Sequence, residues 1–225
     1  MAERVLSRTY GLGPEGGAGM SGDSNKVGKD RIRALHRERR ATMDGGQRET
    51  AGTSLAVHGL AWAEKMAGGT PSTFCAYLGV GFEPPTAPLI SALHGRGHEV
   101  LLPVCEPDRR LSWVYWTPDA EFVRSRYAPI LEPAGTRHGL EIMAGVAALF
   151  IPATALDRSG NRIGQGGGYY DVLLGSLAGS VPDMPLAAIV YDQELLPAGS
   201  LPAEVFDRKV PAALMPAALV SLGDA

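Results

Sequence analysis

One segment of the sequence decides how the chain folds: Ile151-Pro-Ala-Thr-Ala-Leu-Asp-Arg-Ser-Gly-Asn-Arg-Ile-Gly-Gln-Gly-Gly-Gly-Tyr-Tyr-Asp171. It follows an apolar run at residues 146–151 that predicts a buried strand, and it leads into residues 171–177, which have the pattern of an amphipathic helix. Between them, Gly164, Gly166, Gly167 and Gly168 allow positive φ angles and a close approach to a ligand. Because a helix start offers unpaired N–H groups and a positive dipole end, the loop is predicted to cradle phosphate.

Two side chains beside the glycines strengthen this interpretation. Arg162 adds a fixed positive charge at the entrance of the loop, and Asp171 places a carboxylate in the first helical turn, within reach of a metal ion that bridges phosphates. The alternative is a tight connection without a ligand, since glycines often precede helices for that reason alone. The loop also lacks the Gly-Lys-Ser/Thr ending of nucleotide triphosphatases, and Tyr169 stands where a dinucleotide fold needs a third glycine.

Strand-like and helix-like patterns alternate through most of the chain. Strands are predicted at 73–80, 99–104, 111–116, 146–151 and 186–191, and helices at 29–43, 47–66, 86–95, near 139 and at 169–177. This order predicts a single α/β domain with a mostly parallel central sheet, helices on both faces and a hairpin near 99–116. Residues 1–28 are glycine-rich and without periodic apolar positions, so we expect a flexible extension before a domain at 29–225.

The composition limits the classes of function. The 225 residues are 45% hydrophobic and 20% charged, which is typical of a soluble globular protein, and a net charge of −3 argues against general nucleic-acid binding. No secretion signal is visible, and uncharged stretches such as 142–156 are shorter than the ~20 residues that cross a bilayer. We therefore expect a cytoplasmic protein without a membrane partner.

Cys75 and Cys105 are the only cysteines, and both lie in or at the end of strand-like runs. Buried, reduced thiols are the favoured interpretation, and a disulfide is the alternative if the two strands are neighbours.

Basic residues are concentrated in one segment. Residues 26–43 contain seven Lys or Arg and two acidic residues, and Lys29, Arg33, Arg37 and Arg40 follow one stripe of the predicted helix. Adjacent like charges cost about a few tenths of a kcal/mol per pair, which an anionic partner would relieve. A solvated helix face and RNA binding are alternatives, although no aromatic side chain is present to stack a base. We expect this helix and the glycine loop to converge on one triphosphate.

Two further acidic residues follow predicted strands. Glu83 lies at the carboxyl end of the strand at 73–80, where ligands bind in α/β folds, although an ordinary loop acid would look the same. Asp207 follows the last predicted strand and could add a second metal-directed carboxylate if the loops converge; beside Arg208 and Lys209 it is otherwise unremarkable.

Residues 29–215 resemble the 5-formyltetrahydrofolate cyclo-ligase family, also called methenyltetrahydrofolate synthetases. The most specific similarity is Asp157-Arg-x-Gly-x-Arg-Ile-Gly-x-Gly-x-Gly-Tyr-Tyr-Asp171, which looks like the family's nucleotide and magnesium loop. Lys29-x-x-Ile-Arg33, with Arg40, is similar to its N-terminal element on the ATP phosphates. The chain departs from the family pattern at Pro84-Pro85, after Glu83, and at residues 129–133.

The resemblance implies an ATP-dependent ligase that uses Mg²⁺ and converts 5-formyltetrahydrofolate, or its polyglutamates, to 5,10-methenyltetrahydrofolate with release of ADP and phosphate. It implies neither a nucleic-acid partner nor an obligate protein partner. For ATP it implies Lys29, Arg33, Arg162, Ile163, Gly164, Gln165, Gly166, Gly167, Gly168, Tyr169 and Tyr170. For the folate it implies Leu78, Glu83, Gln165, Gly166, Gly167, Gly168 and Tyr169. It implies Asp171 and Asp207 for magnesium, and catalytic roles for Lys29, Arg162 and Tyr170.

Two other classes of function stay open. A sugar-phosphate isomerase or coenzyme A transferase on a similar α/β scaffold would need no ATP, but it would need a catalytic carboxylate or lysine where the loop offers arginine and tyrosine. A non-catalytic protein that binds nucleic acid through the basic helix is the second alternative.

Overall fold

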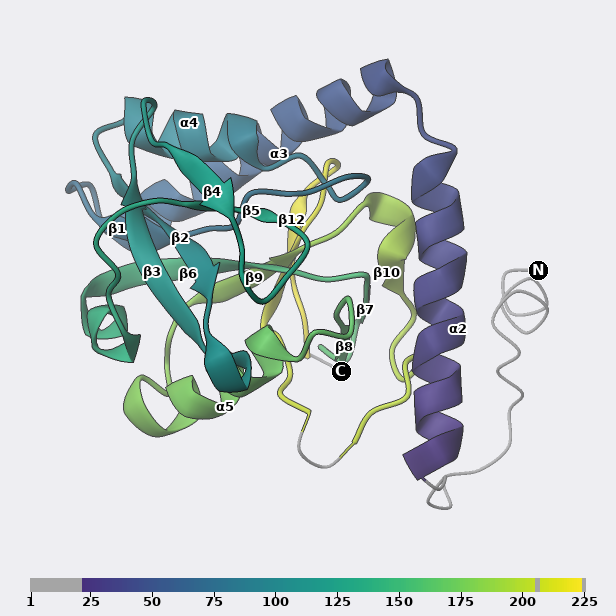
Figure 1. The fold of residues 1–225 in the computed structure, drawn as a ribbon. Coiled ribbons are helices and arrows are strands. Elements are labelled where there is room, and N and C mark those ends of the chain that lie inside the picture. Colours follow the sequence, from purple (N-terminus) through teal and green to yellow (C-terminus); the bar gives the residue numbers. More distant parts are fainter. Residues whose placement is uncertain (1–21, 205–206, 224–225) are drawn as a thin grey trace.

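The computed structural model describes residues 22–204 and 207–223, and a seven-stranded sheet forms its centre (Figure 1). The strand order is β12-β11-β9-β6-β1-β2-β3. The strands are β1 (Thr73–Cys75), β2 (Glu99–Cys105), β3 (Leu111–Trp116), β6 (Val146–Pro152), β9 (Leu186–Ile189), β11 (Ala212–Leu214) and β12 (Leu219–Ser221). All pairs between β11 and β2 are parallel, whereas β3 and β12 add antiparallel edges. The mostly parallel sheet and the hairpin at 99–116 are confirmed.

The central strands are apolar throughout because both faces of the sheet are covered. In β6, Ala148 and Phe150 point into one core and Leu149 and Ile151 into the other. Helices α3 (Gly45–Ala67) and α4 (Ala87–Gly95) cover the first face, and α5 (Tyr169–Ser180), with the 3₁₀ turn η2 (Leu140–Gly145), covers the second (Figure 1). The prediction of helices on both faces is therefore also confirmed.

Helix α2 (Gly22–Ala41) stands at one side of the molecule and packs on a small second sheet (Figure 1). This sheet consists of β10 (Leu195–Leu196), β7 (Ala155–Asp157) and β8 (Arg162–Ile163). Ile32 and Leu35 of α2 pack with Ala155, Ile163 and Leu196 in a separate apolar cluster. The basic helix is thereby attached to the strands that lead into the glycine loop.

A short hairpin and two 3₁₀ turns complete the fold near the sheet. A hairpin of β4 (Phe122–Arg124) and β5 (Leu131–Pro133) follows β3, and single 3₁₀ turns lie at η1 (Pro107–Arg109) and η3 (Asp192–Glu194). Within the described ranges, no helix combines the length and the apolar character needed to cross a membrane.

Several predicted boundaries were wrong. The first helix begins at Gly22 rather than Lys29, so residues 22–28 are helical, and only 1–21 of the predicted extension lie outside the described residues. The strand predicted at 73–80 ends at Cys75, and the next five residues leave the sheet toward the cavity described below. No element was predicted between the strand at 111–116 and the helix near 139, where the structure has the β4–β5 hairpin. Strands of two or three residues are too short to leave a periodic signal.

Both cysteines are buried and free, as favoured by the sequence. Burial raises the pKa of Cys105 to about 12, and it raises that of Cys75 as well, so both side chains are thiols at neutral pH.

Candidate functional site

A cavity of about 620 Å³ opens beyond the carboxyl ends of β1, β2 and β6. Four regions contribute to its wall: helix α2, the segment after β1, the β4–β5 hairpin and the glycine loop. The predicted site residues on this wall are Arg33, Leu78, Glu83, Arg162, Gly164, Gln165, Gly166, Gly167, Gly168, Tyr169, Tyr170 and Asp171. The position agrees with the rule that ligands of open α/β sheets bind at the carboxyl ends of the strands.

The glycine loop connects β8 to the start of α5. Gly168 is the N-cap of α5 with a φ of 77°, and Gly166 has a φ of 100°. These angles lie in the left-handed region, which glycine adopts without the steric penalty of a Cβ atom. The loop thus turns directly into the N-terminus of a 12-residue helix, the arrangement that binds anions through backbone N–H groups.

Arg162 is held in place between the sheet and α5. Its Nη1 donates a hydrogen bond to the carbonyl oxygen of Pro152 at 3.1 Å, and its Nη2 pairs with the carboxylate of Asp171. Only 4% of the Arg162 side chain is exposed, whereas 67% of Asp171 is. The guanidinium is therefore a fixed charge on the cavity wall, and its carboxylate partner lies at the rim.

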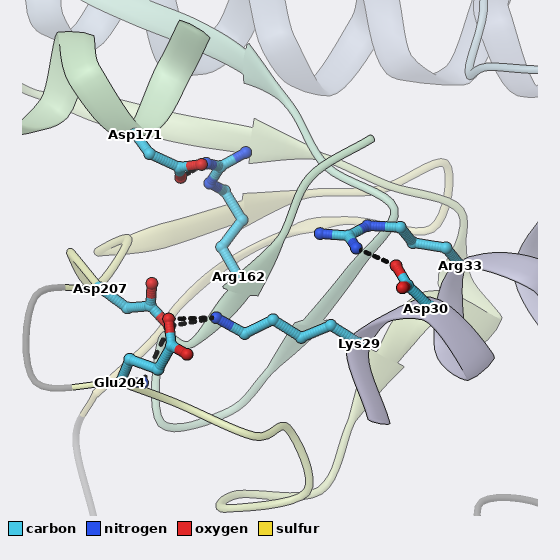
Figure 2. A network of polar contacts seen from close by, with 7 residues as sticks. All are labelled: Lys29, Asp30, Arg33, Arg162, Asp171, Glu204 and Asp207. Carbon is cyan, nitrogen blue, oxygen red and sulfur yellow. Dashed lines mark hydrogen bonds and ion pairs between the residues drawn. The ribbon is translucent and has the colours of Figure 1, made fainter. Parts of the chain in front are cut away.

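The middle of α2 meets the loop directly through Arg33 (Figure 2). Arg33 donates from Nε to the carbonyl oxygen of Gly164 at 2.8 Å and from Nη1 to Asp30 at 2.6 Å. Lys29 instead reaches the carboxyl-terminal segment, with Nζ at 2.7 Å from Asp207 and 3.3 Å from Glu204. The predicted proximity of the basic helix and the glycine loop is confirmed as geometry.

The basic stripe of α2 does not have one role along its length. Arg37 lines the cavity, but Arg40 is only 3% exposed and donates to Glu194 at 2.6 and 2.8 Å and to the carbonyl oxygen of Ala153 at 2.8 Å. Burial opposes the charged form of Arg40, but the bonds to Glu194 raise its pKa. Burial also raises the pKa of Glu194, against the effect of Arg40, and we take the pair as ionised because guanidinium retains its proton in proteins. Arg40 therefore does not belong to the group of cations that were expected to bind one anionic ligand.

Glu83 is oriented toward the glycine loop by three contacts. Its Oε1 accepts a hydrogen bond from Gln165 Nε2 at 3.2 Å, and its Oε2 accepts one from the backbone N–H of Val80 at 3.0 Å. Its carbonyl oxygen accepts a hydrogen bond from the Tyr191 hydroxyl at 3.3 Å. Glu83 is thus a positioned carboxylate on the cavity wall rather than an ordinary loop acid.

The segment around Pro84-Pro85 is ordered by Thr86. Its hydroxyl accepts a hydrogen bond from the N–H of Gly79 at 2.9 Å and donates one to the carbonyl oxygen of Tyr77 at 2.5 Å. Leu78, between these two contacts, is 37% exposed and lines the cavity. The departure from the family pattern at Pro84-Pro85 therefore leaves Leu78 and Glu83 on the same wall.

The two aspartates predicted for magnesium have separate partners, Arg162 for Asp171 and Lys29 for Asp207 (Figure 2). Across residues 22–204 and 207–223, no group of three or more His, Cys, Asp or Glu side chains is arranged to hold a metal. Magnesium at nucleotides commonly takes only one or two protein carboxylates and completes its shell with phosphates and water. Asp171 lies on the cavity wall and fits such a partial shell, whereas Asp207 does not line the cavity, and the assignment of both to magnesium stays a prediction.

Part of the cavity wall was missed by the sequence analysis. This part is mostly apolar and includes Tyr77, Phe82, Leu102, Phe122, Ile130 and Thr154. Tyr77 was missed because all residues of the run 73–80 were assigned to one strand. The only signal was a tyrosine hydroxyl just before Leu78, near the predicted end of that strand. Thr154 had no signal of its own.

The fold and this cavity define an α/β enzyme domain in which a glycine loop leads into the start of a helix. The chain belongs to the 5-formyltetrahydrofolate cyclo-ligase family, whose family model matches residues 25–216. It is 33% identical over 188 residues to the 5-formyltetrahydrofolate cyclo-ligase of Mycolicibacterium smegmatis, covering 80% of this chain and 89% of that protein.

Two solved structures share the fold. The 5,10-methenyltetrahydrofolate synthetase of Mycoplasma pneumoniae superimposes with a TM-score of 0.64 at 14% identity, covering 83% of this chain and 97% of that one. The enzyme of the same name from Aquifex aeolicus also gives 0.64, at 20% identity, covering 88% and 94%.

Proposed function

We propose that the chain closes the ring of 5-formyltetrahydrofolate to 5,10-methenyltetrahydrofolate at the cost of ATP, releasing ADP and phosphate. The observation that carries the proposal is the shared cavity, in which Arg33 and Arg162, the glycine loop and the oriented Glu83 face one space. Membership of the family supports the same reaction.

The chemistry of the reaction suits these residues. The formyl group on N5 is amide-like, so its carbon is a poor electrophile and its oxygen is a poor leaving group. Transfer of the γ-phosphoryl group to that oxygen creates a leaving group, N10 then attacks the carbon, and loss of phosphate completes the ring. Such a transfer depends mainly on alignment and neutralisation of charge.

We assign the phosphates to the cationic side of the cavity. The backbone N–H groups of residues 164–168 and the start of α5 would hold the phosphate oxygens, with Arg33 and Arg162 as fixed charges beside them. Glu83, Gln165 and Leu78 would position the folate, because all three lie on the wall next to the loop.

Asp171 and Asp207 would hold Mg²⁺, which would supply positive charge to neutralise the phosphates. The ion pairs Arg162–Asp171 and Lys29–Asp207 suggest how the protein accommodates it. With nucleotide present, Lys29 would turn from Asp207 to the phosphates and Arg162 would contact them from its fixed position, so that Asp171 and Asp207 would be released to serve the metal. Without nucleotide, the two carboxylates hold these cations in place.

The nucleic-acid alternative has less support. The stripe on α2 would have to present its cations to solvent, but Arg40 is buried against Glu194 and Lys29 is paired with Asp207 and Glu204. We propose that the protein works in the cytoplasm on free or polyglutamylated folate, without a nucleic-acid or membrane partner.

A spectrophotometric assay tests the reaction. Folded protein mixed with Mg-ATP and 5-formyltetrahydrofolate should raise the near-ultraviolet absorbance of the methenyl product, and no rise is expected without ATP or with excess chelator. Absence of product under all conditions would contradict the proposal. Turnover of a phosphosugar or a thioester without nucleotide would favour the isomerase or transferase alternative.

A further inference from the structure

Three residues with buried hydroxyl groups line the cavity from three different elements. Tyr77 follows β1, Thr154 follows β6, and Tyr170 lies in the first turn of α5, and all three line the cavity. Tyr77 is 4% and Thr154 is 2% exposed, and the hydroxyl of Tyr170 is fully buried. None of these hydroxyls has a hydrogen-bond partner within the part of the chain that the structure describes.

Hydroxyls in such positions require a partner. Leaving a buried donor or acceptor unsatisfied is energetically costly, and native proteins rarely do so. Three on one cavity wall therefore indicate a place built for a hydrogen-bonding ligand. The indole Nε1 of Trp113 is also unpartnered, but Trp113 lies in the core and not on the cavity.

The charges around the hydroxyls define the kind of ligand. Burial raises the pKa of Tyr77 and of Tyr170, so both phenols keep their protons and can donate as well as accept. Arg40, also on this wall, is already neutralised by Glu194. Phosphate would find no free positive charge among these groups. A neutral ligand edge with its own donors and acceptors fits them better.

We propose that the hydroxyls of Tyr77, Thr154 and Tyr170 form a subsite for the amide edge of the reduced pterin ring. This inference rests on the proposed function, since it assigns one part of the folate to one part of the cavity. It adds to Glu83 three neutral groups that would select the pterin by its carbonyl oxygen, ring N–H and amino group.

The adenine base of ATP presents a similar edge, but the geometry favours the pterin. Tyr170 lies two residues after Gly168, so the hydroxyl subsite adjoins the predicted phosphate cradle. The formyl-bearing N5 belongs to the pterin itself and must reach the γ-phosphate. Adenine is separated from that phosphate by the ribose and two further phosphates, so it would lie away from the cradle.

Substitutions that remove only the hydroxyl test this assignment. In Tyr77→Phe and in Thr154→Val, calorimetry should show about 2–10-fold weaker binding of 5-formyltetrahydrofolate, because one hydrogen bond is lost. Binding of Mg-ATP should stay within about twofold of wild type, and the melting temperature without ligand should not fall, because an unsatisfied group has been removed. Tyr115→Phe makes the same chemical change outside the cavity and should alter neither affinity.

A fragment identifies which part of the folate is recognised. 5-Formyltetrahydropterin, which lacks the aminobenzoyl-glutamate, should compete for the wild-type site and lose affinity by the same factor in both variants. The subsite is refuted if both variants bind folate and fragment like wild type, or if only ATP binding weakens.

The same measurements separate this inference from the proposed function. If wild type binds folate without turnover and the variants bind it more weakly, the reaction is wrong and the subsite stands. If wild type turns over and the variants bind folate normally, only the subsite is wrong. If wild type does not bind folate, both are overturned.

Discussion

The middle and the end of helix α2 carry the same kind of cation and use it differently. In the middle of the helix, the side chains of Lys29 and Arg33 are 13% and 19% exposed and extend toward the carboxyl-terminal segment and the glycine loop (Figure 2). Near its end, Arg40 is 3% exposed and is enclosed by Glu194 and the carbonyl oxygen of Ala153. Helical spacing aligns the charges, but the neighbouring elements decide which ones a ligand can reach.

The cations of the two stretches differ in exposure because different elements pack against each stretch. Around Arg40, the turn η3 supplies a buried carboxylate that needs a permanent counter-charge, since an unpaired buried charge is costly. Around Lys29 and Arg33, the partners are carboxylates nearer the surface and a loop carbonyl. We therefore expect the end of α2 around Arg40 to govern stability and its middle, around Lys29 and Arg33, to govern ligand binding.

The largest effect should come from Arg40→Met. It leaves Glu194 buried without its counter-charge, and we expect the free energy of unfolding to fall by about 3–5 kcal/mol in urea titrations. The double variant Arg40→Met/Glu194→Gln should recover much of this loss, because Gln keeps an acceptor for the N–H of Tyr191. Unchanged stability in the single variant would contradict the claim that the end of α2 around Arg40 governs stability.

Arg162→Ala should mainly damage catalysis. Loss of a fixed charge at the transferring phosphoryl group should raise the activation free energy by about 2–4 kcal/mol, which lowers kcat/KM roughly 30- to 1,000-fold. Stability should change little, because Asp171 is already largely exposed to water. Arg158→Ala, an exposed arginine outside the cavity, is the matched control, and a wild-type rate in Arg162→Ala would refute the assigned role.

The buried end of α2 should also respond to pH. Burial, followed by the charges of Arg39 and Arg40, lowers the pKa of His36 from 6.5 to about 4, although Glu194 lies 3.7 Å away. The unfolded chain therefore binds the proton more readily, so this contribution to stability is present above pH 6.5 and is lost as the pH falls toward 4. The loss should reach at most about 3 kcal/mol.

Urea titrations at pH 7, 5 and 4 would isolate this contribution. His36→Gln should show a smaller decrease in unfolding free energy over the same range, because the titrating group is gone. Parallel curves for wild type and variant would show that His36 does not contribute.

The smallest effect is expected for Arg33→Ala. Its guanidinium contacts Gly164 and the partly exposed Asp30, so its loss should raise the KM for ATP about 5–10-fold, near 1 kcal/mol, with little change in stability. Arg31→Ala, an exposed arginine on the same helix, should bind ATP normally. If both variants behaved alike, the charge of Arg33 would act only through the general field of the helix.

The sequence alone determined the parts of this protein that depend on local pattern. Continuous apolar runs marked β2, β3 and β6 because their residues are buried on one or both faces, and glycines next to a helix start marked the loop that lines the cavity. The motif ending in Asp171 was specific enough to indicate the family that the family model later matched.

Only the tertiary structure decided which side chains share a space. The partner of Arg40 lies 154 residues away, Gln165 and Glu83 are 82 apart, and Tyr77, Thr154 and Tyr170 follow three different elements. Such contacts depend on strand order and on short strands such as β10, which is stabilised by pairing with the distant strand β7 rather than by its own residues. Local periodicity carries no information on those pairings, so the burial and the partners of these side chains can be known only from the folded chain.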